Sequence, residues 1–215
     1  MNRFILKYPW ILKKLYPKRL SRVAAEKTLF LSFDDGPIPE VTPWVLEQLD
    51  KYSAKATFFC IGDNIRKHPE IFKKIKDKGH AVGNHTFNHL NGWKTSTSDY
   101  LENFRKTERI IESKLEKTLS SEEKLFRPPY GKIKNKQAAK ITKLNYRFVM
   151  WDVITGDYDK NYDAEKCLKN TLNLIRAGSI IVFHDSLKAE KNLKYILPKL
   201  LEEYSQKAWK FKTLT

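Results

Sequence analysis

An apolar, β-prone run ends in two adjacent carboxylates and a glycine-proline break at residues 28–37, with the sequence TLFLSFDDGP. Such a run, bounded by turn residues, predicts a buried strand that delivers acidic groups to its own end. Adjacent side chains on an extended chain point to opposite sides, so Asp34 and Asp35 cannot share one role unless the backbone turns between them. A solvated turn would explain this stretch taken alone, but the residues that follow favour a functional interpretation.

Strand-like and helical patterns alternate along the rest of the chain. The patterns predict strands at residues 28–34, 55–61, 80–83, 124–126, 146–151, 179–183 and 209–214, and helices near 41–52, 69–78, 98–117, 135–143, 163–176 and 188–204. Together these elements make about seven strand-helix units, with no internal linkers or repeats. They predict an α/β domain with a mostly parallel sheet, either open or closed into a barrel.

The composition fits one globular domain with anionic surroundings. The 215 residues are 41% hydrophobic, which is enough for a sizeable core. Lys and Arg outnumber Asp and Glu by 41 to 25, and the formal net charge of +16 favours nucleic acid, acidic lipid or acidic glycan as a neighbour. The two cysteines, Cys60 and Cys167, fit neither a disulfide framework nor a metal knuckle, so they leave the compartment open.

The N-terminal residues 1–22 contain seven basic residues and no acidic one. Lysines and a proline interrupt their apolar clusters, so a signal peptide is not indicated, and no stretch approaches the roughly 20 apolar residues of a membrane span. We expect residues 1–25 to form a basic arm packed on or flanking the domain. The alternative is peripheral contact with an acidic membrane through residues 1–22. A cytoplasmic location, or one at the inner face of a membrane, is therefore favoured.

Ionisable side chains follow five of the predicted strands. The carboxyl ends of parallel strands meet at one edge of a sheet, so these side chains should lie together. They are Asp34 and Asp35 after the first strand, His85 and His89 after the third, Arg127 after the fourth, Asp152 and Asp157 after the fifth, and His184 and Asp185 after the sixth.

These groups can together form a metal hydrolase. His85 and His89 are four residues apart and would share one face of a helical turn, although this spacing alone often arises by chance. One carboxylate and two imidazoles are a common zinc set, which leaves the second carboxylate to act as a base on a water whose pKa the metal lowers. Arg127 could hold that base ionised, and His184 could protonate a leaving group.

Five segments in this order resemble the motifs of the polysaccharide deacetylases, carbohydrate esterase family 4, also called the NodB homology domain. They are FDDGP at 33–37, HTFNH at 85–89, RPPYG at 127–131, WDVITGDY at 151–158 and FHD at 183–185. Each motif is weak alone, but five in the right order are a strong signal. The resemblance covers residues 26–215 and implies one catalytic domain there, folded as a distorted, incomplete (β/α) barrel of about seven strand-helix units.

The resemblance implies metal-dependent removal of acetyl groups from a poly- or oligosaccharide, with the N-acetyl group of N-acetylglucosamine units as the first candidate. An O-acetyl esterase acting on acetylated glycan is an alternative. The implied cofactor is one divalent metal ion, zinc in the first place, with cobalt or another divalent ion as alternatives. The expected partner is the acetylated glycan, with no specific nucleic acid, and the expected oligomeric state is a monomer.

The family's functional residues carry over position by position. The resemblance implies that Asp34 is the general base and that Arg127 orients it. It also implies that the metal is bound by Asp35, His85 and His89, and that the backbone amide of Tyr130 stabilises the oxyanion. The implied general acid is His184, whose pKa Asp157 tunes. The expected substrate pocket contains Pro128, Trp151 and Tyr158. Trp93, in a loop after the second motif, is a packing residue or else a platform for a sugar ring.

The fourth motif departs from the pattern W-x-x-D-x-x-D-W of many family members. Ile154 replaces the first acid, and Tyr158 replaces the second tryptophan. We interpret these changes as an altered pocket shape, because the metal ligands, base and acid are all present. A non-catalytic glycan-binding protein on the same scaffold is the rival hypothesis, and it predicts a broken catalytic set, which this chain does not have.

Overall fold

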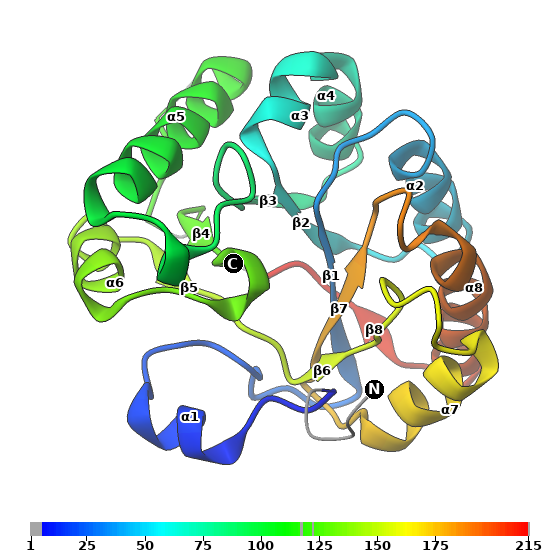
Figure 1. Ribbon diagram of the computed structural model, residues 1–215. Coiled ribbons are helices and arrows are strands. Elements are labelled where there is room, and N and C mark those ends of the chain that lie inside the picture. The colour runs from blue at the N-terminus through cyan, green and yellow to red at the C-terminus, as the bar shows by residue number, and fades with distance from the viewer. Residues whose placement is uncertain (1–5, 117, 122, 215) are drawn as a thin grey trace.

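Strands and helices alternate along most of the chain in the computed structural model, which describes residues 6–116, 118–121 and 123–214 (Figure 1). The strands are β1 (Thr28–Asp34), β2 (Ala56–Cys60), β3 (Ala81–Asn84), β4 (Leu125–Phe126), β5 (Arg147–Phe148), β6 (Val153–Ile154), β7 (Ile180–His184) and β8 (Lys210–Phe211). The α-helices are α1 (Trp10–Leu15), α2 (Thr42–Lys51), α3 (Gly62–Lys67), α4 (Pro69–Asp77), α5 (Thr97–Leu115), α6 (Asn135–Thr142), α7 (Ala164–Leu174) and α8 (Glu190–Gln206). Two 3-10 helices, η1 (Gly92–Lys94) and η2 (Pro129–Gly131), lie in loops.

Seven parallel strands form a curled sheet in the order β5-β4-β3-β2-β1-β7-β6, and β8 adds to the start of β1. The larger helices lie outside this sheet, so the structure is an incomplete barrel with an outer layer of helices (Figure 1). The predicted distorted, incomplete (β/α) barrel is therefore confirmed.

The strand β1 is the centre of the sheet. All seven of its residues are buried, because β2 and β7 flank it and side chains fill both of its faces. The ring of Phe33 stacks between those of Phe58 and Phe183, with centroids 5.0 and 5.5 Å away. The parallel register places Asp34 opposite His184, so the carboxyl ends of β1 and β7 are level. The core thus fixes two ionisable groups at the same edge.

The predicted strand at residues 146–151 is wrong in its extent, because this segment crosses from one edge of the sheet to the other. β5 pairs with β4, whereas β6 pairs with β7 at the opposite end of the strand order. The Val149 N–H still donates to the Phe126 carbonyl of β4 at 2.9 Å, whereas the Asp152 N–H donates to the Ile180 carbonyl of β7 at 2.8 Å, so the segment changes partner strand between these two residues, at the gap between the two edges. The sequence pattern also missed the helices α1 and α3, which are only six residues long.

The described part of the N-terminal arm fills this gap in the barrel. The backbone of Leu20 pairs with the crossing segment beside Val149, accepting from the Met150 N–H at 2.7 Å and donating to the Phe148 carbonyl at 2.8 Å. The Ile154 N–H donates to the Leu6 carbonyl at 2.8 Å. The arm therefore supplies hydrogen-bond partners that an open sheet edge would otherwise lack.

The buried carboxylate of Asp152 ties the arm down. Lys7 and Lys13 donate to its two oxygens at 2.9 and 3.2 Å, and Ser179 donates at 2.7 Å. Burial alone would raise the pKa of Asp152, but the hydrogen bonds from Ser179 and Lys7 hold this pKa below its usual value. The ring of Tyr8 packs edge-on against the neighbouring Trp151, with centroids 5.3 Å apart.

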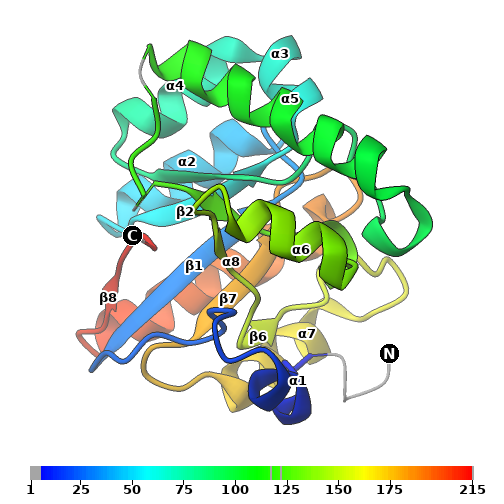
Figure 2. The ribbon, with the colours of Figure 1, turned by 90° about the vertical axis from the view of Figure 1, so that its left-hand side faces the viewer.

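The helix α1 lies beyond these anchors, at the edge of the barrel beside β6 in both Figure 1 and Figure 2. It has no buried residue. Among the aromatic residues of the described part of the arm, Tyr8 is buried and Trp10 is exposed. Within the described part of the chain, no helix is long and apolar enough to cross a membrane.

A glycine substitution tests the packing of the arm against the barrel. A Cβ at Gly178, whose φ is 82°, would lie 1.8 Å from the carbonyl oxygen of Val23. Gly178→Ala should lower the free energy of unfolding by about 3 kcal/mol or more, because the left-handed backbone and the overlap both cost energy. Urea denaturation followed by circular dichroism measures this loss.

The control for this experiment is Gly79→Ala. Its φ of 74° is similar, but the nearest atom to an added Cβ is a lysine side chain 3.8 Å away. It should therefore lose only about 1 kcal/mol. Equal losses in the two variants would show that Val23 does not pack against Gly178 as described.

Candidate active site

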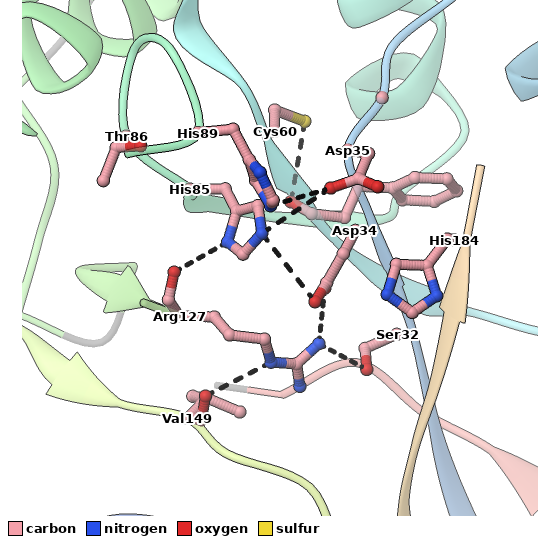
Figure 3. Close-up of polar contacts among 12 residues, drawn as sticks. Ser32, Asp34, Asp35, Cys60, His85, Thr86, His89, Arg127, Val149 and His184 are labelled. Carbon is pink, nitrogen blue, oxygen red and sulfur yellow. Dashed lines mark hydrogen bonds and ion pairs between the residues drawn. The ribbon is translucent and has the colours of Figure 1, made fainter. Parts of the chain in front are cut away.

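The ionisable groups that follow different strands meet at the carboxyl edge of the sheet. Figure 3 shows their side chains around one space, with Asp34 and Asp35 between the two imidazoles of the second motif, His85 and His89, and the ring of His184. The groups come from the end of β1, from the loops after β3 and β4, and from the end of β7. These groups lie together, as expected from the strand ends, whereas Asp152 does not join them, because its carboxylate bonds to Lys7, Lys13 and Ser179.

Arg127 and Asp34 form a buried ion pair. The guanidinium is only 1% exposed, and its Nη1 lies 2.6 Å from Asp34 Oδ1. The same guanidinium donates to Ser32 Oγ at 2.9 Å and to the carbonyls of Val149 and Met150 at 3.2 and 2.8 Å. Burial would raise the pKa of Asp34, but the charge of Arg127 holds this pKa below its usual value. Asp34 is therefore an oriented, ionised carboxylate at neutral pH.

The backbone turns at Asp35, so the two adjacent carboxylates face different partners. Asp35 has a φ of 85°, and its carbonyl accepts a hydrogen bond from Asn64 Nδ2 at 2.7 Å. Its Oδ1 lies 3.2 Å from His89 Nε2 and 3.8 Å from His85 Nε2. The division of roles expected from the sequence thus has a geometric basis in this turn.

The loop with the two histidines is not a helical turn, and that expectation is wrong. Thr86 and His89 both have positive φ, at 63° and 54°. Long-range hydrogen bonds shape the loop instead, because Asn103 Oδ1 accepts from the N–H groups of Phe87 and Asn88 at 2.8 and 3.0 Å. The two imidazoles nevertheless converge, with ring centroids 5.0 Å apart.

His85 is oriented by the residue that holds the base. Its Nδ1 lies 2.7 Å from the carbonyl oxygen of Arg127, which directs Nε2 toward Asp35. Burial lowers the pKa of His85, and burial together with the neighbouring imidazole lowers the pKa of His89 to about 4. Both rings are therefore neutral near pH 7, which is the form that binds metal.

Asp35, His85 and His89 fit the requirements of a divalent metal site. One ligand atom from each lies within 4.8 Å of the others. Asp35 Oδ1 is a buried oxygen with no hydrogen-bond partner among the described residues, which is costly unless another group binds it. Two imidazoles and one carboxylate are a donor set that zinc prefers.

His184 is held on the other side of the site by Asp157. Its Nδ1 lies 2.8 Å from Asp157 Oδ1, and its backbone N–H donates to Asp157 Oδ2 at 2.8 Å. Burial alone would lower the pKa of His184, but the charge and hydrogen bond of Asp157 raise it to about 9. With Nδ1 engaged by Asp157, the ring can offer Nε2 to a reacting group. The ring of Tyr158 packs 5.0 Å away.

The residues expected to contact the substrate differ in how far they are exposed and in what they contact. Tyr130 has a φ of 60°, is 60% exposed and contacts the ring of His89 at 4.5 Å. Pro128 is buried before η2. Trp151 packs beneath the same loop, where a Cβ at Gly131 would lie 2.8 Å from its ring. Trp93, also 60% exposed, donates from Nε1 to a backbone carbonyl at 3.3 Å.

Sequence reasoning left Asp185 without a role, although it stands in the last motif. This fully buried carboxylate accepts from the Gly36 N–H at 3.0 Å and from Thr42 Oγ1 at 2.6 Å. Burial raises its pKa to about 8. A Cβ at Gly36 would lie 2.0 Å from its Oδ2, so only glycine fits there. Asp185 thereby holds the turn that contains Asp35, and its place beside His184 was the available signal.

A groove beside Asp35 and His89 was also not foreseen. It has a volume of about 360 Å³, and its walls come from α3 and its preceding residue and from the segment after β7. Its lining residues are Asp35, Ile38, Ile61, Asn64, His89, Ser186, Leu187 and Lys188. Only the tertiary structure brings these segments together.

Comparisons with known proteins agree with this fold. The family model described as Polysaccharide deacetylase matches residues 21–149. A peptidoglycan-N-acetylglucosamine deacetylase of Bacillus cereus is 37% identical over 183 residues, which cover 83% of this chain and 62% of that relative. The chain thus spans less than two thirds of that relative's length.

Two solved structures extend the likeness to the whole fold. A crystal structure of a peptidoglycan N-acetylglucosamine deacetylase, bound to an N-hydroxybenzamide derivative, is 33% identical and has a TM-score of 0.85 over 96% of this chain and 95% of that one. A mutant of a family 4 pseudoenzyme with restored enzymatic activity is 26% identical, with a TM-score of 0.79 over 94% of this chain and 72% of that one. Because the family model spans more than half of the sequence and these relatives share its fold, the chain belongs to the polysaccharide deacetylase family.

Proposed function

We propose that this protein is a metal-dependent hydrolase that removes N-acetyl groups from N-acetylglucosamine units of a poly- or oligosaccharide. The observation that supports it best is the placement of an ionised Asp34 and a protonated His184 on either side of a ligand set for one metal ion. The relatives named as peptidoglycan-N-acetylglucosamine deacetylases support the choice of substrate.

The metal ligands in this proposal are Asp35, His85 and His89. A bound divalent ion, zinc in the first place, would polarise the acetyl carbonyl and lower the pKa of a coordinated water. The backbone amide of Tyr130 would donate to the oxygen on which negative charge develops. The protein's part here is to hold three neutral or anionic donors in place before substrate arrives.

Asp34 takes the proton of the attacking water. It can do so because Arg127 keeps it ionised and fixes its direction with a 2.6 Å contact. A base in the correct protonation state and within reach of the proton is the first requirement of general base catalysis. Arg127 itself stays charged and acts by positioning Asp34.

His184 gives a proton to the departing sugar nitrogen. Its pKa of about 9 keeps the ring protonated at neutral pH, so it is ready to act as an acid. An amine leaves only when its nitrogen is protonated, whereas an ester oxygen leaves more easily. The strong His184–Asp157 pair therefore favours N-deacetylation over the O-acetyl esterase alternative.

Acetate release tests this proposal directly. The substrates are chitooligosaccharides, peptidoglycan fragments and acetylated xylan, each with and without a chelator. We expect release from the first or second substrate and its loss with chelator. Release from acetylated xylan alone would support the esterase, and no release from any of the three would support the non-catalytic glycan binder.

Three variants separate metal binding from catalysis. The purified protein should hold about one zinc or similar ion per chain, measured by elemental analysis. Asp35→Ala and His85→Ala should lose the ion, whereas Asp34→Asn should retain it and lose roughly a hundredfold or more in turnover. Unchanged metal content in the ligand variants would refute the assigned site.

The pH dependence of activity tests the role of His184. Because its protonated form is required, kcat/KM should fall as the pH rises through about 9. Asp157→Asn removes the charge that raises this pKa, so the basic limb should move toward pH 6.5, the ordinary value for histidine. NMR titration of the His184 ring should show the same shift, and an unmoved basic limb would exclude His184 as the acid.

The same pair predicts a pH-dependent contribution to stability. Since the folded pKa of His184 lies above the unfolded value, the stabilisation is complete below about pH 6.5 and is lost as the pH rises through about 9. Asp157→Asn should flatten this part of the curve of unfolding free energy against pH.

We also propose that the protein acts as a monomer whose helix α1 touches an acidic membrane surface. Trp10, Ile11 and Leu15 are 64, 53 and 64% exposed, and α1 buries none of its residues. Lys14 lies beside them, with Nζ 5.1 Å from the ring of Trp10. Apolar side chains flanked by lysines are typical of helices that bind the interface of anionic lipid.

Vesicle binding tests this contact. The protein should sediment with phosphatidylglycerol-containing vesicles, less so at high salt, and not with pure phosphatidylcholine. Trp10→Glu should weaken this binding, whereas Trp93→Glu, which alters a similarly exposed tryptophan, should not. Equal binding by the two variants would contradict the proposal. If the wild type forms a dimer that Trp10→Glu dissociates, the partner of α1 is a second copy of the chain and not a membrane.

A further inference from the structure

A second groove shares two lining residues with the groove beside the metal ligands. Leu187 and Lys188 line the groove that contains Asp35 and His89. The same two residues line a second groove of about 500 Å³, which continues over the start of α8. The second groove therefore adjoins the first along Leu187 and Lys188, within reach of a polymer bound at the metal ligands.

The second groove is rich in positive charge. Its lining residues are Lys160, Leu187, Lys188, Glu190, Lys191, Asn192 and Lys194. Glu190 is the single carboxylate among them, and it pairs with Lys194 at 2.6 Å. Lys160, Lys188 and Lys191 are exposed, and no ion pair of these three is seen within the described residues. These three lysines therefore line one groove together.

Lys188 stands close to the reacting groups. Its Nζ lies 5.6 Å from the centre of the Tyr158 ring, and that ring lies 5.0 Å from the ring of His184. One aromatic ring thus separates the ammonium group from the proposed acid. An ionised group on the substrate at this place would belong to the acetylated sugar or to its immediate neighbour.

We propose that Lys160, Lys188 and Lys191 bind carboxylates of the substrate, so the preferred substrate is an acidic glycan. This inference rests on the proposed deacetylase function. The carboxylates can belong to a sugar acid or to a peptide attached to the glycan, since both present the same group. Each exposed pair contributes little alone, but three cations in one groove act together and steer an anionic chain toward the site.

Matched substrates test this inference. The acidic ones are N-acetylglucosamine oligosaccharides with neighbouring sugar carboxylates and, separately, with carboxylates on an attached peptide. Their neutral partners carry the same carboxylates as methyl amides. Selectivity is the ratio of kcat/KM on each acidic substrate to that on its neutral partner, at low and at high salt.

The triple variant Lys160→Gln, Lys188→Gln, Lys191→Gln removes the charge of the groove. The matched control, Lys74→Gln, Lys114→Gln, Lys136→Gln, removes three exposed lysines that line neither groove, so the net charge changes equally. Selectivity should fall about tenfold in the groove variant, which is about 1.4 kcal/mol, chiefly through KM, and should persist in the control. High salt should reduce the selectivity of the wild type.

The possible outcomes separate this inference from the function on which it rests. Acetate release from neither member of a pair would refute the deacetylase function itself. Equal turnover of acidic and neutral substrates by the wild type would leave that function standing and overturn the inference. Selectivity that survives in the groove variant, or that falls equally in the control, would also overturn the assignment to these three lysines.

Discussion

The buried guanidinium of Arg127 is the interaction on which the rest of the site depends. Its charge balances that of Asp34, and the backbone carbonyl oxygen of the same residue orients His85. One residue therefore holds both the proposed base and a proposed metal ligand. It also donates to Val149 and Met150, in the segment that crosses the gap in the barrel. A buried ion pair is weak evidence of net stability, but the loss of one partner is strongly destabilising, because the other charge is left without compensation.

This dependence connects the N-terminal arm to the chemistry. The two carbonyls that accept from the Arg127 guanidinium lie in the crossing segment, and the backbone of Leu20 bonds to Phe148 and Met150 of that segment. Lys7 and Lys13 hold the adjacent Asp152, and Tyr8 packs on Trp151. The arm therefore supports the frame that positions the guanidinium, in addition to covering an open edge of the sheet. The same arm presents the exposed residues of α1 to the surroundings.

The parallel register of β1 and β7 explains why base and acid lie on opposite sides of one site. It sets Asp34 level with His184, and each strand then turns away with the next residue. Asp185, which follows His184, bonds to the N–H of Gly36 in the turn after Asp34. The ends of β1 and β7 are thus linked by a hydrogen bond, and Asp185, next to the proposed acid His184, holds the turn that contains Asp35. The groove beside Asp35 and the groove that contains the lysines share Leu187 and Lys188, which follow Asp185 closely in the chain.

The sequence by itself determined the alternation of strands and helices, the buried central strand and the set of ionisable groups at the strand ends, because local periodicity and residue type carry that information. It did not determine the loop shape around His85 and His89, the division of the segment after α6 into β5 and β6, the role of Asp185 or the position of the lysine groove next to the groove at the site. Each of these depends on hydrogen bonds or packing between residues far apart in the chain, such as Asn103 with the histidine loop. Only the tertiary structure decided them, since such contacts arise from the closure of the barrel and leave no periodic pattern in the sequence.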